Sequence, residues 1–131
     1  MISPLQESIY NVLTAGLSYD VYDQPPQSED GALNAPFPYV TIDDYKPNNN
    51  DTDTELAFDG QLQINVWSRH FGNKEASDIQ KEIYDLLHRT QPAVVGYGVV
   101  DIQQQFAEVL KDPDGITRHG IQRFRVMIQL D

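Results

Sequence analysis

Two long runs of alternating apolar and polar residues near the C-terminus predict a β-hairpin over residues 99–130. A period of two is typical of strands with one buried and one solvated face. Between the two arms, Pro113, Asp114 and Gly115 supply the residue types that turns prefer. The apolar residues that we assign to one face of each arm are Val100, Ile102, Phe106, Leu110, Phe124, Val126, Ile128 and Leu130.

The middle of the chain repeats this alternation. Residues 37–45 and 56–69 are predicted strands, and a short strand is predicted at Val21 and Tyr22. The run 46–55 contains no apolar residue, so we expect an exposed, flexible loop that joins two strands of a second hairpin. Residues 24–36 contain three prolines and are predicted as another flexible loop.

Two segments instead have apolar residues at spacings of three and four, which is the period of an amphipathic helix. The first helix should begin at Ser3 and Pro4 and end near Gly16. The second should be capped by Asn73 and end near His88. The two apolar stripes are formed by Leu5, Ile9, Val12 and Leu13, and by Ala76, Ile79, Ile83, Leu86 and Leu87.

This order of elements predicts the fold class. Hairpins imply antiparallel pairing, and two amphipathic helices can cover one face of the resulting sheet. We therefore expect an α+β two-layer sandwich, with an antiparallel sheet of four to five strands and two helices on one face. A length of 131 residues fits one domain over residues 1–131.

Composition narrows the classes of function. The chain has no cysteine, and no apolar run approaches the roughly 20 residues that span a bilayer, so we expect a soluble protein with no disulfides and no cleaved signal. Residues 1–60 hold eleven acidic residues and one basic residue, Lys46, and so carry −10 of the net charge of −11. Such an acidic half disfavours binding to nucleic-acid phosphates.

Candidate catalytic and metal-binding patterns are weak. Residues 112–115 (DPDG) imitate the start of a calcium loop, but the later ligands are missing and a turn is the better interpretation. His70, His88 and His119 lack the spacing of metal ligands. We predict no catalytic residue, no metal and no cofactor.

One enzymatic alternative stays open. A small ligand-binding or hydrolytic domain could use Asp43, Asp44 and His119, provided that the fold gathers them in one pocket. Such pockets usually enclose about 300–1,000 Å³.

Several segments, in the same order along the chain, resemble the tail completion (tail terminator, head–tail joining) proteins of long-tailed bacteriophages and prophages. The polar run 46–55 departs from the resemblance. The segments that carry it are 35–42 (APFPYVTI), 64–79 (INVWSRHFGNKEASDI), 86–88 (LLH) and 110–126 (LKDPDGITRHGIQRFRV).

The resemblance implies a virion structural protein that acts by assembly. Such proteins form a ring, usually of six subunits, on the head-proximal end of the tail tube, where they end tube polymerisation and meet the head completion protein at the connector. DNA passes through the ring without specific binding, and no membrane is involved. The expected location is the head–tail interface of the virion, and the host cytoplasm during assembly. A head-side neck or adaptor protein is the alternative, and the high net charge is compatible with monomers before the tube is met.

Two sets of residues are candidate sites. Acidic residues could line the lumen and repel DNA, or dock onto a partner: Asp43, Asp44, Asp51, Asp53, Glu55 and Asp59. Ring closure requires one patch to meet a different patch of the neighbour, and arginine and tryptophan are enriched at interfaces. The candidate contacts to neighbouring subunits or to the tube are Trp67, Arg69, Arg118, His119, Arg123 and Arg125.

Overall fold

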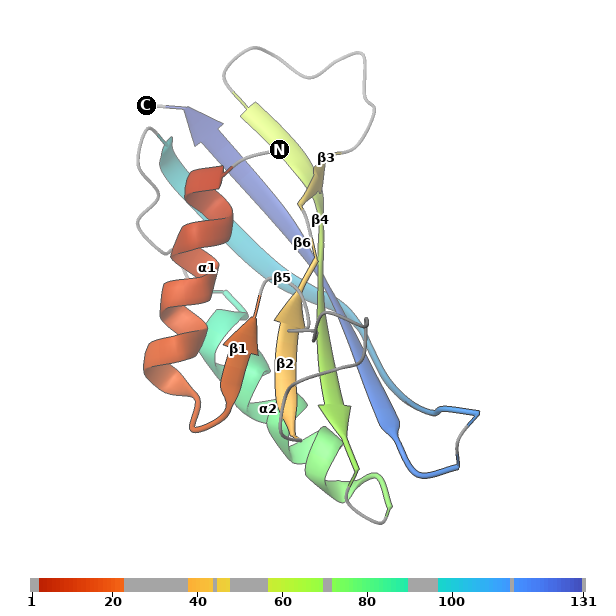
Figure 1. Ribbon diagram of the computed structural model, residues 1–131. Coiled ribbons are helices and arrows are strands. Elements are labelled where there is room, and N and C mark those ends of the chain that lie inside the picture. Colours follow the sequence, from red (N-terminus) through yellow and green to blue (C-terminus); the bar gives the residue numbers. More distant parts are fainter. Residues whose placement is uncertain are drawn as a thin grey trace, which may run out of the picture.

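The computed structural model describes residues 3–22, 38–43, 45–47, 57–69, 72–89, 97–113 and 115–130. Its elements are arranged as helices packed on a twisted sheet (Figure 1). In chain order they are α1 (Ser3–Gly16), β1 (Asp20–Tyr22), β2 (Tyr39–Ile42), β3 (Lys46–Pro47), β4 (Ala57–Ser68), α2 (Lys74–Leu87), β5 (Tyr97–Lys111) and β6 (Arg118–Leu130).

The strands form one sheet in the order β1-β2-β4-β6-β5, with β3 also paired to β4. The pairs β2–β4, β4–β6 and β5–β6 are antiparallel, as the hairpin patterns predicted. The β1–β2 pair departs from that prediction because it is parallel, so the sheet is mixed. Residues 23–38 separate these two strands, and a parallel pair needs such a long connection.

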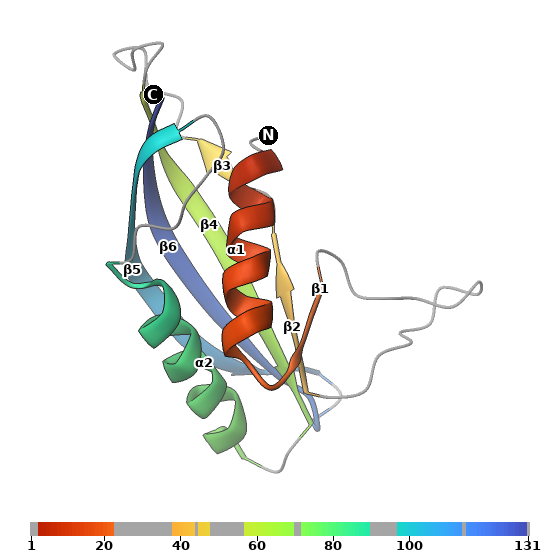
Figure 2. The ribbon, with the colours of Figure 1, turned by 90° about the vertical axis from the view of Figure 1, so that its left-hand side faces the viewer.

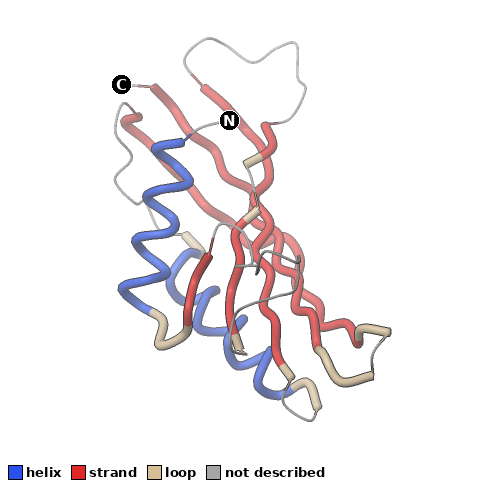
Figure 3. Tube along the Cα trace, viewed as in Figure 1, coloured by secondary structure: helices blue, strands red, loops and turns tan. Residues whose placement is uncertain are grey.

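Both helices lie on the same face of the sheet, which confirms the predicted α+β sandwich (Figures 2 and 3). Leu5, Ile9 and Leu13 of α1 are fully buried, as are Ile79, Ile83 and Leu87 of α2. Neither these nor any other helix in the described ranges is long and apolar enough to cross a membrane. The sheet contributes Val40, Ile42, Leu62, Ile64, Val66, Ile102, Phe124, Val126 and Ile128 to the same core.

The two helices meet where α1 ends. A Cβ on Gly16 would lie 2.6 Å from a methyl carbon of Leu86 in α2, so only glycine allows this approach without displacing Leu86. The predicted end of α1 is therefore confirmed, although the reason is close packing. Asn73 precedes α2 as predicted, but its side chain makes no capping hydrogen bond, and its Oδ1 instead accepts one from Arg118 Nε at 2.9 Å.

The C-terminal hairpin is the longest pair of strands and extends beyond the helices at the lower right of Figure 1. Its turn closes through Gly115 N–H to Asp112 O and Asp112 N–H to Thr117 O, each at 2.9 Å. Gly115 has φ of +76°, which a side chain would disfavour. The turn interpretation of residues 112–115 is confirmed, although Asp114 lies outside the described residues.

A β-bulge in β5 overturns part of the predicted hairpin. The register shifts between Gln104 and Phe106, so that one extra residue, Gln105, stands on β5. Ile102 is buried as predicted, but beyond the bulge the faces are exchanged. Phe106 and Leu110 therefore leave the core side, and they are 39% and 40% exposed.

The predicted loops are described only in part. Residues 24–36 and 48–55 lie outside the described residues. Lys46 and Pro47, predicted as the start of the polar loop, instead form β3 and pair with Gln61 and Gly60.

Candidate functional site

The face of the sheet opposite α1 and α2, which we call the outward face, carries most of the described candidate residues. The alternation of each strand places them there, because every second side chain points away from the helices. The register sets their rows side by side: Trp67 opposite His119, Gln63 opposite Arg123, and Gln61 opposite Arg125. The strands involved are β2, β4, β6 and β5.

An aromatic stack crosses one end of this face. Trp67 and His119 stack with ring centroids 3.9 Å apart and planes 10° apart, and Tyr39 lies on the far side of Trp67 at 6.3 Å. The indole Nε1 of Trp67 donates to Thr41 Oγ1 at 3.2 Å. Trp67 and His119, both predicted as contacts, thus form one unit that is half-buried before any partner binds.

His119 also hydrogen-bonds to the amide of Asn65, which in turn hydrogen-bonds to the carboxylate of Asp43. Its Nε2 lies 2.8 Å from Asn65 Oδ1, and Asn65 Nδ2 donates to Asp43 Oδ1 at 3.1 Å. Because the amide oxygen must accept, Nε2 is the protonated nitrogen in this arrangement. Burial lowers the pKa of His119, opposed by the carboxylates of Asp112 and Asp43. The imidazole is therefore neutral at physiological pH.

In the next row, Arg123 is held by contacts other than an ion pair within the described residues. Its Nε donates to Gln63 Oε1 at 3.1 Å, and Gln63 Nε2 in turn donates to Asn65 Oδ1 at 2.9 Å. The guanidinium carbon lies 5.2 Å from the ring centre of Phe106, a cation–π distance. Phe106, turned outward by the bulge, thus covers one side of Arg123.

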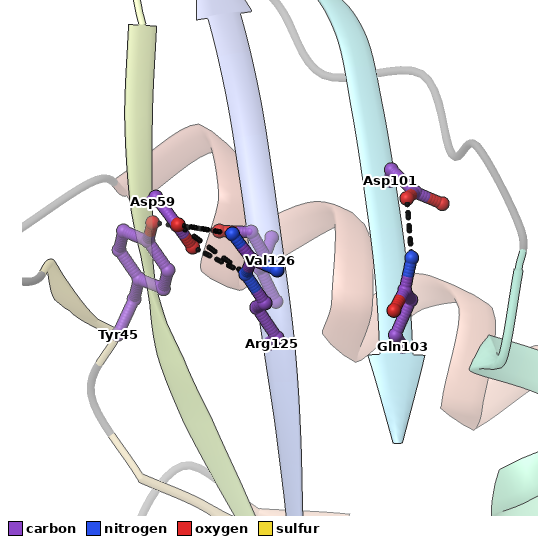
Figure 4. A network of polar contacts seen from close by, with 6 residues as sticks. All are labelled: Tyr45, Asp59, Asp101, Gln103, Arg125 and Val126. Carbon is purple, nitrogen blue, oxygen red and sulfur yellow. Dashed lines mark hydrogen bonds and ion pairs between the residues drawn. The ribbon is translucent and has the colours of Figure 1, made fainter. Parts of the chain in front are cut away.

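Arg125 forms a two-pronged ion pair with Asp59 (Figure 4). Arg125 Nε donates to both carboxylate oxygens, at 3.0 and 3.2 Å, and Nη2 lies 2.7 Å from Oδ2. The hydrogen bonds from Arg125 lower the pKa of Asp59. Figure 4 also shows Gln103 donating to Asp101 on β5, at 3.1 Å. Asp59, predicted for the lumen, and Arg125, predicted for a subunit contact, thus lie side by side.

Arg69 and Arg118 contact the hairpin turn and the segment before α2. Arg69 Nε donates to Thr117 Oγ1 at 3.2 Å, and Arg118 Nε donates to Asn73 Oδ1. Both arginines thus connect the turn to the segment that joins β4 to α2. Their first role in this structure is to position the hairpin.

Sequence reasoning missed Phe106 and Leu110 as candidate surface residues. The available signal was the pattern of β5 itself, in which Gln104, Gln105 and Glu108 interrupt the apolar alternation. A bulge shifts the alternation by one residue and is compatible with such an interruption, but the interruption alone does not specify it. With Ile116 of the turn, which is 60% exposed, Phe106 and Leu110 place three exposed large apolar side chains on the C-terminal hairpin.

The geometry does not support the alternative of a small ligand-binding or hydrolytic domain. Asp43 lines a hollow of about 160 Å³ with Lys46, Gln61, Gln63 and Arg123, but His119 does not, and the volume is below that of usual ligand pockets. Among the described residues no group of three or more histidines or carboxylates is placed to hold a metal ion. Four predicted acids fall outside the described residues: Asp44, Asp51, Asp53 and Glu55.

Comparison with known proteins decides the family. A family model for tail completion protein gp17 matches residues 9–129, from the middle of α1 to Gln129 in β6. The chain belongs to the tail completion protein gp17 family. It is thus a structural component of a bacteriophage tail, as the sequence resemblance implied.

Individual relatives agree with this membership. The tail completion protein gp17 of Bacillus phage SPP1 is 29% identical over 93 residues, which is 71% of this chain and 69% of that protein. The solved structure of SPP1 gp17 matches with a TM-score of 0.54 and 21% identity, covering 98% of this chain and 90% of that one. A chain from the virion of a native gene transfer agent particle matches with a TM-score of 0.77 and 19% identity, over 95% and 94% of the two chains. At such identities the structural matches show a shared fold.

Proposed function

We propose that this protein caps the head-proximal end of the phage tail tube, ends tube polymerisation and joins the tail to the head by assembling into a ring. The observation that carries the proposal is the family match over residues 9–129, which runs from the middle of α1 into the last residues of β6. The match to a chain of an assembled particle shows that this fold occurs in such particles.

The described surface supports action by assembly and not by catalysis. The polar side chains of the outward face hydrogen-bond one another, from Asp43 through Asn65 and Gln63 to Arg123. Such a network holds side chains in fixed positions, which lowers the entropy that a rigid contact must lose on binding. A pre-ordered, shallow face suits a protein partner better than a small molecule.

The partners in this proposal are the tail tube protein on one side and the head completion or connector protein on the other. The proposed ring consists of six copies of this chain, the number that the resemblance to the family implies, and each contact is heterologous. Arg123, Arg125, Trp67 and His119 contribute to contacts with neighbouring subunits or the tube. Arg69 and Arg118 act there by holding the hairpin turn in position.

The acidic residues belong to the surface along which DNA passes or to a docking site. Asp43 lies on the outward face with its carboxylate bonded to Asn65, and Asp59 is paired with Arg125. Asp44, Asp51, Asp53 and Glu55 add charge of the same sign nearby in the sequence. Carboxylates repel the phosphates of DNA and so limit adhesion during ejection.

Deletion of the gene from its phage tests the proposal. We expect overlong tails, tails without heads, or both, visible by electron microscopy, with rescue by the wild-type chain. Tails of normal length that attach to heads would contradict it. Capture of the chain on purified tail tubes, but not on isolated connectors, separates the tail-side role from a head-side neck or adaptor.

A further inference from the structure

The backbone hydrogen bonding at the outer edge of β5 differs before and after the bulge. In an antiparallel ladder, the N–H and C=O of one residue both point to the same side of the strand, and the side alternates along the chain. Before the bulge, Ile102 O accepts from Arg89 N–H at 2.6 Å and Gln104 N–H donates to His88 Nδ1 at 3.0 Å. The end of α2 thus satisfies the outer edge of β5 at these two residues.

Beyond the bulge the edge is open. Gln104 faces the edge and stands opposite Phe124, whereas Phe106 stands opposite Arg123 and faces β6. The alternation then turns the backbone groups of Ala107, Val109 and Lys111 to the outer edge. Within the described ranges no hydrogen bond reaches these groups, and Ala107 and Lys111 are exposed. Unpaired groups of this kind are a template for another strand.

The opposite side of the sheet offers one comparable edge. On that side β3 is closed to pairing, because Pro47 has no N–H and the N–H of Tyr45 donates to Gln6 Oε1 at 2.7 Å. The strand order ends in β1, and no described strand lies beyond it. β1 has three residues and is shorter than the five-residue open stretch of β5.

We infer that the open edge of β5 at Ala107–Lys111 pairs with the β1 edge of a second copy of this chain, so that neighbouring sheets join into one. The inference rests on the proposed ring, in which two different patches must meet. Edges at opposite ends of one sheet meet this requirement, and their pairing leaves neither open. Phe106 and Leu110, beside the open edge, add apolar area to the contact.

The first test removes one edge donor. Ala107→Pro deletes an N–H that the intramolecular ladder does not use, and the proline ring obstructs an incoming strand. We expect a melting temperature close to that of the wild type and about tenfold or greater loss of ring formation on purified tail tubes. Ala107→Ser keeps the N–H and is the matched control, with rings as in the wild type. Normal rings from folded Ala107→Pro would overturn the inference.

The second test identifies the partner edge without relying on the proline variant. The chain has no native cysteine, so Glu108→Cys with Asp20→Cys or Tyr22→Cys reports contact between facing strands by disulfide formation. All three side chains lie on the outward face. We expect a ladder of cross-linked oligomers from the paired variants and none from single variants.

The other outcomes of cross-linking overturn the inference in different ways. Dimers from Glu108→Cys alone mean that β5 meets itself. No cross-links in rings that form and cap tubes normally mean that another surface closes the ring, and the proposed function stands. If the wild type neither forms rings nor caps tubes, the proposed function fails first.

Discussion

Side chains on the sheet lie either in the core or on the outward face, and on β5 the one-residue bulge decides which. Phe124 and Phe106 lie on neighbouring strands, in adjacent rows of the register that the bulge at Gln105 separates. Phe124 is fully buried beneath the helices, whereas Phe106 is 39% exposed and lies against Arg123 on the outward face. Phenylalanine therefore fills the core at position 124 and covers an arginine on the surface at position 106.

Replacement of these two phenylalanines measures that difference. Phe124→Ala should lower the free energy of unfolding by about 3–5 kcal/mol, because it removes a buried ring and leaves a cavity. Phe106→Ala, the matched control, should lose about 1 kcal/mol or less, since its ring is partly solvated and its cation–π contact is exposed. Urea denaturation followed by circular dichroism gives both values. Similar losses would mean that the two rings are equally buried.

His119 should make stability depend on pH. Burial lowers its folded pKa below the ordinary value of 6.5, so below about pH 6.5 the unfolded chain takes up a proton that the folded chain does not. The stabilising contribution is thus complete above pH 6.5 and is lost as the pH falls towards the folded pKa. We expect the melting temperature of the wild type to fall more between pH 7.5 and pH 5.5 than that of His119→Phe. The phenyl ring keeps a surface for stacking on Trp67 but cannot titrate. Parallel curves for the two proteins would refute this role.

The helices and strands were predictable to the extent that their periodicity was regular. The stripe of α2, the alternation of β4 and the turn before β6 all follow the sequence pattern, because one buried face imposes its period on the residues. The bulge was not predicted, since an extra Gln105 changes the phase without any Gly or Pro to announce it. The parallel β1–β2 pair was missed because three residues cannot show their partner's direction.

Contacts between elements were the least predictable part of the candidate site. Arg118 pairs with Asn73, 45 positions away, and Arg125 pairs with Asp59, 66 positions away. A sequence indicates that such residues are polar and exposed, but only the strand register brings them together. For this reason Asp43 and Asp59, predicted for the lumen, share the outward face with four of the predicted contacts. Those four are Trp67, His119, Arg123 and Arg125.

Charge reversal on β6 should damage assembly more than folding. Arg123→Glu with Arg125→Glu places two acids on the outward face, next to Gln63 and Asp59, while the buried side chains between them are unchanged. We expect a small loss of melting temperature and a severe loss of ring formation on tail tubes.

The matched control makes the same change in charge on the other side of the molecule. Lys74→Glu with Lys81→Glu also breaks two exposed contacts, those with Asp78 and Asp85 on α2. This variant should assemble like the wild type. Equal loss of assembly in both variants would mean that net charge, and not the outward face, limits ring formation.

The whole chain is strongly acidic, and its charge is concentrated in residues 1–60. Copies that carry a net charge of −11 repel one another, and this repulsion opposes any contact until salt or a partner screens it. The screening length is about 10 Å at 0.1 M salt and about 30 Å at 0.01 M. Long-range repulsion between copies is therefore weak at moderate ionic strength and strong at low ionic strength.

Self-association should accordingly increase as salt is raised from about 0.01 M to about 0.1 M, the range over which repulsion is screened. Sedimentation velocity at fixed protein concentration measures this self-association.

Replacement of Asp51 and Asp53 by Asn and of Glu55 by Gln should lower the salt concentration required for self-association, because it changes the net charge from −11 to −8. The control makes the same change on α2, with Asp78→Asn, Glu82→Gln and Asp85→Asn. If the run around Asp53 faces a lumen where several copies converge, its neutralisation must have the larger effect. Equal effects would reflect net charge alone, and normal association with lost binding to tubes would instead make this run a docking segment for the tube protein.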